Sequence, residues 1–496
     1  SIHSLQILNT SGGLTMKAVK LFPVILLSLL LVAGYLLAAQ TSAAPDTTIV
    51  VNTLEDEDIV DQNCSLREAI TAANSNAMVD GCPAGSSTDI DIITFNVTGT
   101  ITLASDSLPD ILAAGGALLI DGDHAITIDG DHNCQVITIQ SGAELILQKL
   151  RIANGTTEYH GGGLSNHGEL TIKSSTLVGN GIFTTSVSTN YGGAIYNTGI
   201  LTITNSELTD NHISGVQSGH GGALFNAINS QVYISTSTFA RNTISVTGKA
   251  FGGGLVNAGK MVITDSSIYS NSIPHPITET YGGGVYNTGE RLDISNSTIS
   301  GNTAGGALYN ETDGLVDIAY STFADNDSWG INNSNIVTLT ATILTDMCND
   351  NSGIVDGGYN LEEEDTCGFS SGASTDPQIA PLGDYGGETF THALLPGSPA
   401  IDQVDPASCP ASDQRGVSRP VDGDEDGNAL CDIGAFEYQP GIDFLPTYTT
   451  ITSDEPDPSY VNQPFTVTTT ISSTIGTPTG TVTVTVGGTE AFCSSS

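Results

Sequence analysis

Three aspartates occupy alternate positions of the segment DGDEDG and precede a glycine: Asp422, Asp424 and Asp426. Carboxylates at this spacing, followed by a residue that permits a sharp turn, open many calcium-binding loops. The twelfth-position glutamate of an EF-hand is missing because Ile433 stands there, so Asn428 or Asp432 would complete the ligand shell. The segment therefore predicts a structural Ca²⁺ site, and the alternative is a solvated acidic turn.

Two further aspartates, Asp293 and Asp317, stand at the same position of two successive sequence repeats, with Arg291 close to the first. If the repeats stack as strands about 4.8 Å apart, the carboxyl groups lie near the separation of about 5 Å that a retaining glycosidase needs. Stacked carboxylates also arise by chance, so these three residues are weak catalytic candidates.

Aromatic side chains recur at one outward position of the same repeats: Tyr196, Phe225, Tyr286 and Tyr309. Stacked along a sheet, these rings would form a platform for the sugar rings of a glycan. The alternative is an aromatic ladder that only stabilises the sheet. The sequence contains no GxSxG motif, phosphate-binding loop or CxxC zinc pattern.

The elements that must position these groups come from a repeat in the centre of the chain. The unit Gly-Gly-small-aliphatic-x-Asn occurs six times, beginning at Gly161, Gly192, Gly221, Gly252, Gly282 and Gly305. Each copy precedes a segment in which aliphatic residues alternate with polar ones, a pattern typical of strands. We therefore predict an all-β fold, a right-handed parallel β-helix, over residues 96–375.

Columns of like residues support this interpretation. The fourth position of every unit is aliphatic and should point inward, and the sixth is always Asn. A second Asn column runs from Asn180 to Asn326, and a Ser column from Ser175 to Ser321. Asn amides stacked at turns can hydrogen-bond from coil to coil. Four longer coils contain inserts that should emerge along one edge and form a wall beside one sheet.

Eight cysteines include three pairs that are close in sequence: Cys64 and Cys82, Cys348 and Cys367, and Cys409 and Cys431. We predict these three disulfides, which an oxidising compartment would permit. Export is also indicated by residues 16–43, where a basic start, an apolar run and small residues read as a signal peptide. The alternative is an uncleaved membrane anchor. Residues 1–15 are expected to be a non-native leader.

The charge composition limits the classes of partner that the protein can bind. The chain has 54 acidic residues and only 12 Lys and Arg, which gives a formal net charge of −42. This balance argues against binding nucleic acid, because phosphate contacts need clustered basic residues. It is compatible with calcium, or with a neutral or basic partner. No membrane span is expected after signal cleavage.

Two flanking segments resemble known modules. The motif CSLREAI, residues 64–70, resembles the CSLREA-type N-terminal module of bacterial surface proteins, and its Ser65 and Glu68 form a capping-box pattern. Residues 45–95 should therefore cap the solenoid with a short helix. Residues 376–440, with HALLPGSPAID, DQRG and CDIGAFEY, resemble the choice-of-anchor Q module of exported bacterial proteins. This resemblance implies surface association, not a reaction.

Residues 441–496 are similar to the start of a bacterial Ig-like repeat, a partial β-sandwich, and suggest that the chain is a fragment. Taken together, the sequence favours an exported bacterial protein that binds or displays glycan or protein at the cell surface. Adhesion or glycan binding is the leading hypothesis. A polysaccharide lyase or glycoside hydrolase is the second, and a structural surface component without a ligand is the third.

Overall fold

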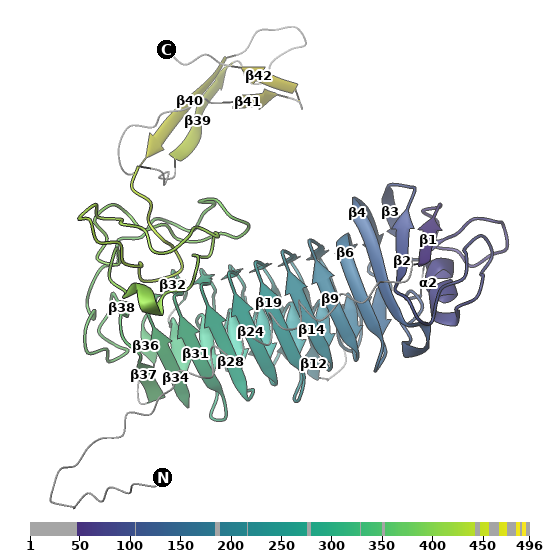
Figure 1. The fold of residues 1–496 in the computed structure, drawn as a ribbon, viewed down its shortest axis with the longest axis horizontal. Coiled ribbons are helices and arrows are strands. Elements are labelled where there is room, and N and C mark those ends of the chain that lie inside the picture. Colours follow the sequence, from purple (N-terminus) through teal and green to yellow (C-terminus); the bar gives the residue numbers. More distant parts are fainter. Residues whose placement is uncertain are drawn as a thin grey trace, which may run out of the picture. The chain divides into compact units, whose positions relative to one another are not determined.

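The computed structural model describes residues 47–441, apart from 105, 184–188, 216, 275–278, 328 and 350–352, and also four strands between 447 and 492. The repeats stack in register as coils of a parallel β-helix, in which each glycine-rich unit pairs with the same unit of the next coil. The predicted fold class is confirmed (Figure 1). The predicted leader and signal peptide lie outside the described residues.

Each coil contributes strands to three faces. Face 1 contains the longer strands, and its members are β1 (Thr47–Val51), β2 (Asp91–Phe95), β4 (Ala117–Asp129), β6 (Glu144–Ala153), β9 (Glu169–Lys173), β14 (Ile200–Thr204), β19 (Gln231–Ser235), β24 (Lys260–Thr264), β28 (Arg291–Ser295), β31 (Leu315–Ala319), β34 (Ile336–Thr340) and β37 (Ile354–Asp356).

Face 2 follows after a corner. It contains the second halves of β4 and β6 together with β3 (Gly99–Thr102), β10 (Thr176–Val178), β15 (Glu207–Thr209), β20 (Thr238–Ala240), β25 (Ser267–Tyr269), β29 (Thr298–Ser300), β32 (Thr322–Ala324), β35 (Ile343–Leu344) and β38 (Leu361–Glu362).

Face 3 is built from the glycine-rich units and closes the coil. Its strands are β5 (Ile137–Ile139), β8 (Leu164–Asn166), β13 (Ile195–Asn197), β18 (Leu224–Asn226), β23 (Leu255–Asn257), β27 (Val285–Asn287), β30 (Leu308–Asn310), β33 (Ile331–Asn333) and β36 (Cys348–Asn349). The aliphatic column of this face, from Leu164 to Leu308, is fully buried, as expected for side chains that stack inside the solenoid.

Two ladders of buried Asn side chains join the coils at their corners. In the ladder of the glycine-rich units, the Nδ2 of each Asn donates to the Oδ1 of the Asn on the next coil at 2.7–3.0 Å, from Asn166 to Asn333. The second ladder runs from Asn180 to Asn326 at 2.8–3.2 Å. Because these amides are buried, each lost partner would leave an unsatisfied polar group.

The Ser column forms a third ladder at the corner between faces 1 and 2. From Ser175 to Ser297, the backbone N–H of each Ser donates to the Oγ of the Ser on the next coil at 3.1–3.3 Å. The residue before each Ser has a positive φ, such as 46° at Ser174 and 49° at Asn205. This left-handed residue turns the chain, so the ladder repeats the same corner in every coil.

The paired glycines form the entrance to face 3. The first glycine has a positive φ, 66° at both Gly161 and Gly192. A Cβ on the second glycine would meet the neighbouring coil, since at Gly193 it would lie 2.0 Å from the carbonyl oxygen of Gly222. The first position therefore needs glycine for its conformation, and the second needs it because two backbones approach closely.

The inserts of the four longer coils, predicted to form a wall along one edge, contribute strands to two small parallel sheets. The first sheet contains β7 (Thr156–Thr157), β11 (Gly181–Phe183), β16 (His212–Ser214) and β21 (Thr243–Ser245). The second contains β12 (Thr189–Tyr191), β17 (Ser218–His220), β22 (Lys249–Phe251) and β26 (Glu279–Tyr281). We call these two sheets the lobe. Ile182, Ile213 and Ile244 give it a hydrophobic core of its own.

Helix α2 (Leu66–Ser75) contacts β1 and β2 at the N-terminal end of face 1. Its predicted capping box is present, with Ser65 as N-cap and the Glu68 side chain bonded to the Ser65 backbone. A short 3₁₀ helix, η1 (Ala113–Gly115), packs beside it. The helix thus covers apolar side chains that the terminal coil would otherwise expose.

Residues 376–440, which include the 3₁₀ helix η3 (Pro406–Ser408), pack against face 2 of the last coils. The buried Gln414 of the DQRG motif donates to Ser267 Oγ at 3.1 Å and accepts from Thr298 Oγ1 at 2.6 Å. His392 Nε2 lies 2.9 Å from Ser300 Oγ. The segment therefore covers β25, β29 and β32 and leaves face 2 of the earlier coils open.

The three predicted disulfides are present, with Cα–Cα distances of 4.8, 5.0 and 6.3 Å in order along the chain. Cys134 is a buried free thiol, and Cys493 lies outside the described residues. Within 441–496 the structure describes two antiparallel pairs, β39 (Thr447–Glu455) with β40 (Thr466–Ser473) and β41 (Thr483–Val486) with β42 (Thr489–Phe492). The Ig-like assignment stays a prediction.

The second Asn ladder ends on a carboxylate, which makes its last step sensitive to pH. Asp346 accepts the Asn326 backbone N–H at 3.0 Å and the Asn326 Nδ2 at 2.8 Å. Burial raises the pKa of Asp346 to about 6. Because the folded-state pKa lies above the ordinary value, the stabilisation from its proton is complete below about pH 4 and is lost as the pH rises through 6.

We therefore expect Asp346→Asn, whose single amide oxygen can accept both bonds as Asn326 Oδ1 does from Asn302, to raise the free energy of unfolding by about 1–2 kcal/mol at pH 7.5 and to leave it unchanged near pH 4. Urea unfolding at the two pH values measures this difference. The exposed Asp313→Asn serves as the matched control and should have no effect at either pH. Equal stability of Asp346→Asn and the wild type at pH 7.5 would contradict the prediction.

Candidate functional site

Asp293 and Asp317 are paired in register on β28 and β31, as the repeat predicted. Arg291 bridges them: its Nε lies 2.8 Å from the Asp293 carboxylate, and its Nη2 bonds Asp317. All three side chains are one-third to one-half exposed. Burial raises the pKa of Asp293, and Arg291 opposes this rise.

This trio has the chemistry of an exposed ion-pair cluster. A retaining glycosidase needs one protonated carboxyl and one carboxylate. A guanidinium that contacts both carboxyl groups favours the ionised form of each. The two aspartates therefore lie together, but the positive charge of Arg291 opposes the protonated form that a general acid needs.

The predicted aromatic column lies on face 3 and stacks along it. The rings of Tyr196 and Phe225 are 5.8 Å apart and nearly parallel, as are those of Tyr286 and Tyr309 at 5.3 Å. The column is interrupted by Val256, which is fully buried. Tyr286 is also buried, so the column is partly covered and is not a flat open sheet.

The cover is a second column that sequence reasoning missed. It consists of the residues directly before each Gly-Gly pair: His160, Tyr191, His220, Phe251 and Tyr281. The glycine corner folds this column against the first. Tyr191 lies 4.5 Å from Phe225, Phe251 lies 4.9 Å from Tyr286, and Tyr281 lies 4.5 Å from Tyr309, as distances between ring centres.

The signal for this column was visible as a ring or imidazole before the glycines in five copies, but only the corner geometry shows its partner. We call the two columns together the aromatic cluster. Seven of its nine members are aromatic and two are histidines, and all except Tyr286 are half-buried. The cluster follows the solenoid axis over successive coils.

The aromatic cluster carries no positive charge at neutral pH. Burial lowers the pKa of His220 to about 4 and also lowers the pKa of His160. Burial raises the pKa of Tyr286, and its hydrogen bond of 2.6 Å to Glu311 adds to the shift. A neutral, half-exposed aromatic surface suits an uncharged ring-shaped ligand such as a sugar.

The acidic segment at 422–427 gathers a different set of carboxylates from the one predicted. Asp422 and Asp424 lie beside Asp402, and ligand atoms of all three lie within 4.8 Å of one another. One carboxylate oxygen of Asp422 is buried and has no hydrogen-bond partner among the described residues. Asp426, which is exposed, is not a member of this group.

Asp432 also lies outside the group, because its position follows from the core of residues 376–440. Its carboxylate accepts the backbone N–H groups of Asp402 and Tyr438 and is completely buried. Burial, with a smaller contribution from Glu437, raises the pKa of Asp432, and Arg419 opposes the rise. Asp432 was predicted to be a metal ligand itself. In the structure it instead positions Asp402, and Asp402 lies beside Asp422 and Asp424.

Among the described residues, every helix is too short or too polar to cross a membrane. No protein-family model matches the chain, and no curated protein does. A search of solved structures finds a similarity to "Crystal structure of pectate lyase Pel9A", with a TM-score of 0.46 and 12% sequence identity. The match covers 80% of this chain and 98% of that chain.

Proposed function

We propose that the protein is an exported glycan-binding protein of the cell surface, in which the β-helix presents the aromatic cluster to a neutral polysaccharide. The single observation that supports this function is the run of half-exposed rings along face 3 and the lobe. The strand register fixes their spacing, so a rigid platform exists before the ligand arrives. Preorganisation of this kind lowers the entropic cost of binding.

Hydrophobic contact with a sugar face should make single rings important. We expect Tyr196→Ala and Tyr309→Ala each to weaken binding of a neutral oligosaccharide about three- to tenfold, the range that one aromatic contact supplies. A glycan array selects the oligosaccharide, and calorimetry on the full chain measures its affinity.

Tyr233→Ala is the matched control, because Tyr233 is exposed on face 1 and lies outside the aromatic cluster. Its affinity should equal that of the wild type. Absence of any array signal, or an equal loss in Tyr233→Ala, would leave the cluster as a ladder that only stabilises the solenoid. A structural surface component is then the remaining hypothesis.

A polysaccharide hydrolase is the second candidate, and the observation in its favour is the in-register pair Asp293 and Asp317. If it is correct, the full chain should release reducing ends from a polysaccharide, and Asp293→Asn or Asp317→Asn should lower the rate by at least about a hundredfold. A reducing-sugar assay over neutral and acidic polysaccharides measures this. Given the bridging Arg291, we expect no release by the wild type.

We also propose that Ca²⁺ binds the group formed by Asp402, Asp422 and Asp424. Hard carboxylate oxygens suit this ion, and the unpartnered oxygen of Asp422 is a free ligand. The Asp402 carboxylate already accepts the backbone N–H groups of Gly423 and Asp424, at 2.7 and 2.8 Å. The loop is thus shaped in advance, and the ion would have a structural role.

The expected dissociation constant is about 0.1–1 mM, the range of extracellular calcium modules. Calorimetric titration of the full chain with CaCl₂ should show this binding, and Asp424→Asn should weaken it about tenfold. Asp426→Asn is the control in the same loop and should weaken it less than about twofold. The proposal fails if the wild type takes up no Ca²⁺ at millimolar concentration, or if both variants weaken binding equally.

Export and surface attachment complete the proposal. Three disulfides are consistent with an oxidising, extracellular location. The predicted signal peptide at 16–43 and the resemblances to CSLREA-type, choice-of-anchor Q and Ig-like modules support localisation at the bacterial cell surface. In this proposal the Gln414 and His392 motifs fasten residues 376–440 to the solenoid.

A further inference from the structure

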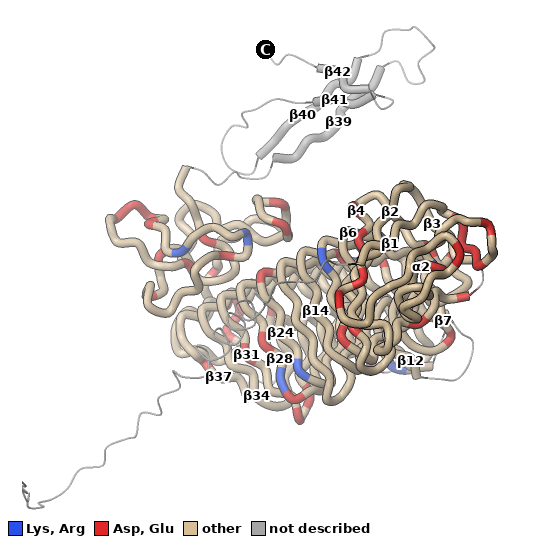
Figure 2. The backbone as a smooth tube through the Cα atoms, turned by 45° about the vertical axis from the view of Figure 1, so that its right-hand side comes forward, with Lys and Arg blue, Asp and Glu red and all other residues tan. Residues whose placement is uncertain are grey.

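Positive charge is scarce in the described part of this chain (Figure 2). Ten of the twelve Lys and Arg residues lie in the described part of the chain. Eight of these ten form ion pairs with Asp or Glu. Within the described residues, the two without an ion pair are Arg151 and Lys173, which are exposed on the neighbouring strands β6 and β9.

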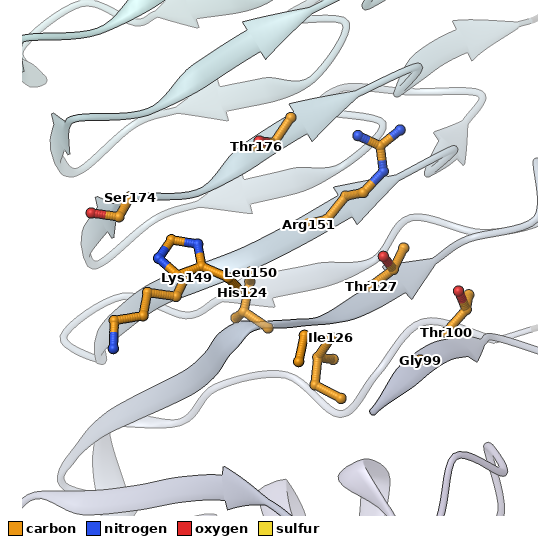
Figure 3. Close-up of a pocket in the computed structure, with 11 residues that line it drawn as sticks. Gly99, Thr100, His124, Ile126, Thr127, Lys149, Leu150, Arg151, Ser174 and Thr176 are labelled. Carbon is orange, nitrogen blue, oxygen red and sulfur yellow. The ribbon is translucent and has the colours of Figure 1, made fainter. Parts of the chain in front are cut away.

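A groove of about 340 Å³ lies at this position, over the early coils of face 2 that residues 376–440 leave open. Arg151 lines it, and Ser174, the residue after Lys173, lies on its wall. Lys149 and His124 line the end nearer the corner with face 1 (Figure 3). The groove therefore contains two of the few cations of an acidic protein, Lys149 and Arg151.

A row of hydroxyl groups runs along the groove beside the guanidinium. Strand register aligns Thr100, Thr127, Arg151 and Thr176 on four successive coils. Figure 3 shows Arg151 between Thr127 and Thr176. None of these four side chains has a hydrogen-bond partner among the described residues. Neighbouring members are about 4.8 Å apart, so one ligand can contact several of them.

The chemistry of the row indicates its ligand. A guanidinium binds a carboxylate or a sulfate through two parallel hydrogen bonds. Threonine hydroxyls both donate and accept, and so they match the hydroxyl groups of a sugar. One oxyanion beside several hydroxyl groups is the chemistry of an acidic saccharide.

The local charge limits how acidic that saccharide can be. Lys149 is already offset by Asp123 at 3.5 Å and Asp121 at 3.9 Å. Of the described Lys and Arg residues, Arg151 and Lys173 alone have no ion pair, in a chain with a net charge of −42. A densely charged polyanion would be repelled by the rest of the protein, whereas an isolated oxyanion in the groove meets mainly Arg151.

We propose that this groove binds a saccharide with widely spaced carboxylate or sulfate groups, with the oxyanion on Arg151 and the sugar hydroxyls on the threonine row. The site is separate from the aromatic cluster and does not depend on it. It gives the surface a second specificity, for acidic sugars.

Calorimetry on the full chain tests the proposal with three oligosaccharides in 50 mM NaCl. A hyaluronate octasaccharide supplies carboxylates on alternate sugars, a keratan sulfate octasaccharide supplies sulfates without carboxylates, and chitohexaose supplies neither. At least one of the two acidic oligosaccharides should bind, and chitohexaose should not compete with it. Comparison of hyaluronate with keratan sulfate shows whether the groove prefers a carboxylate or a sulfate. Arg151→Gln should weaken binding about tenfold or more, since a charge-assisted bidentate contact is lost.

Lys260→Gln is the matched control, because Lys260 is exposed on face 1, outside the groove, and is paired with Glu290. It should leave the affinity within twofold. Thermal unfolding confirms that the exposed Arg151 variant is folded. The proposal is overturned if Arg151→Gln loses no more than Lys260→Gln, or if neither acidic oligosaccharide binds at millimolar concentration. Polygalacturonate, a fourth ligand with a carboxylate on every sugar, should bind more weakly than the better acidic oligosaccharide. If it binds more tightly than both acidic oligosaccharides, the preference for widely spaced charges is wrong.

Discussion

The Asn and Ser ladders are the constraint on which the rest of this structure depends. Every coil must place a polar group at its corners, and each such group is buried between two neighbouring coils. A buried amide is tolerated only when its donors and acceptors are all used. The ladders meet this demand by repetition, since each Asn serves both the coil before and the coil after it. Coil length can vary from 23 to 31 residues because the ladders fix the corners and leave the segments between them free.

The lobe shows what that freedom permits. Extra residues leave the coil after the second Asn ladder and return at the glycine pair, so both ends of each insert are fixed. Within these limits the inserts form parallel strands with an Ile core, and their last residue folds back over face 3. The aromatic cluster results from this return. It is neutral, half-buried and held by backbone register, which distinguishes it from the ion-paired Asp293 and Asp317 on face 1.

The distribution of charge also distinguishes one region of the surface from the rest. With many more acids than bases, most of the described cations are held by nearby carboxylates, and of the two that have no ion pair, Arg151 lines the groove. Residues 376–440 cover face 2 at the other end, so they limit the accessible length of this face. The same segment collects Asp402 with Asp422 and Asp424. Its DQRG and CDIGAFEY motifs are explained by packing: Gln414 reaches the solenoid, and Arg415 lies over the Phe436 ring.

The sequence by itself determined the coil. The aliphatic, Asn and Ser columns, the capping box at Ser65 and the three disulfides were all readable, because each depends on local spacing or on strict repetition. Tertiary structure alone decided the sites. The ring before each glycine pair acquires a partner only when the corner folds it onto face 3, and Asp402 joins Asp422 from twenty residues away. Arg151 matters because it has no ion pair among the described residues and because threonines of other coils lie beside it. Such contacts depend on distances across coils, which spacing along one chain does not specify.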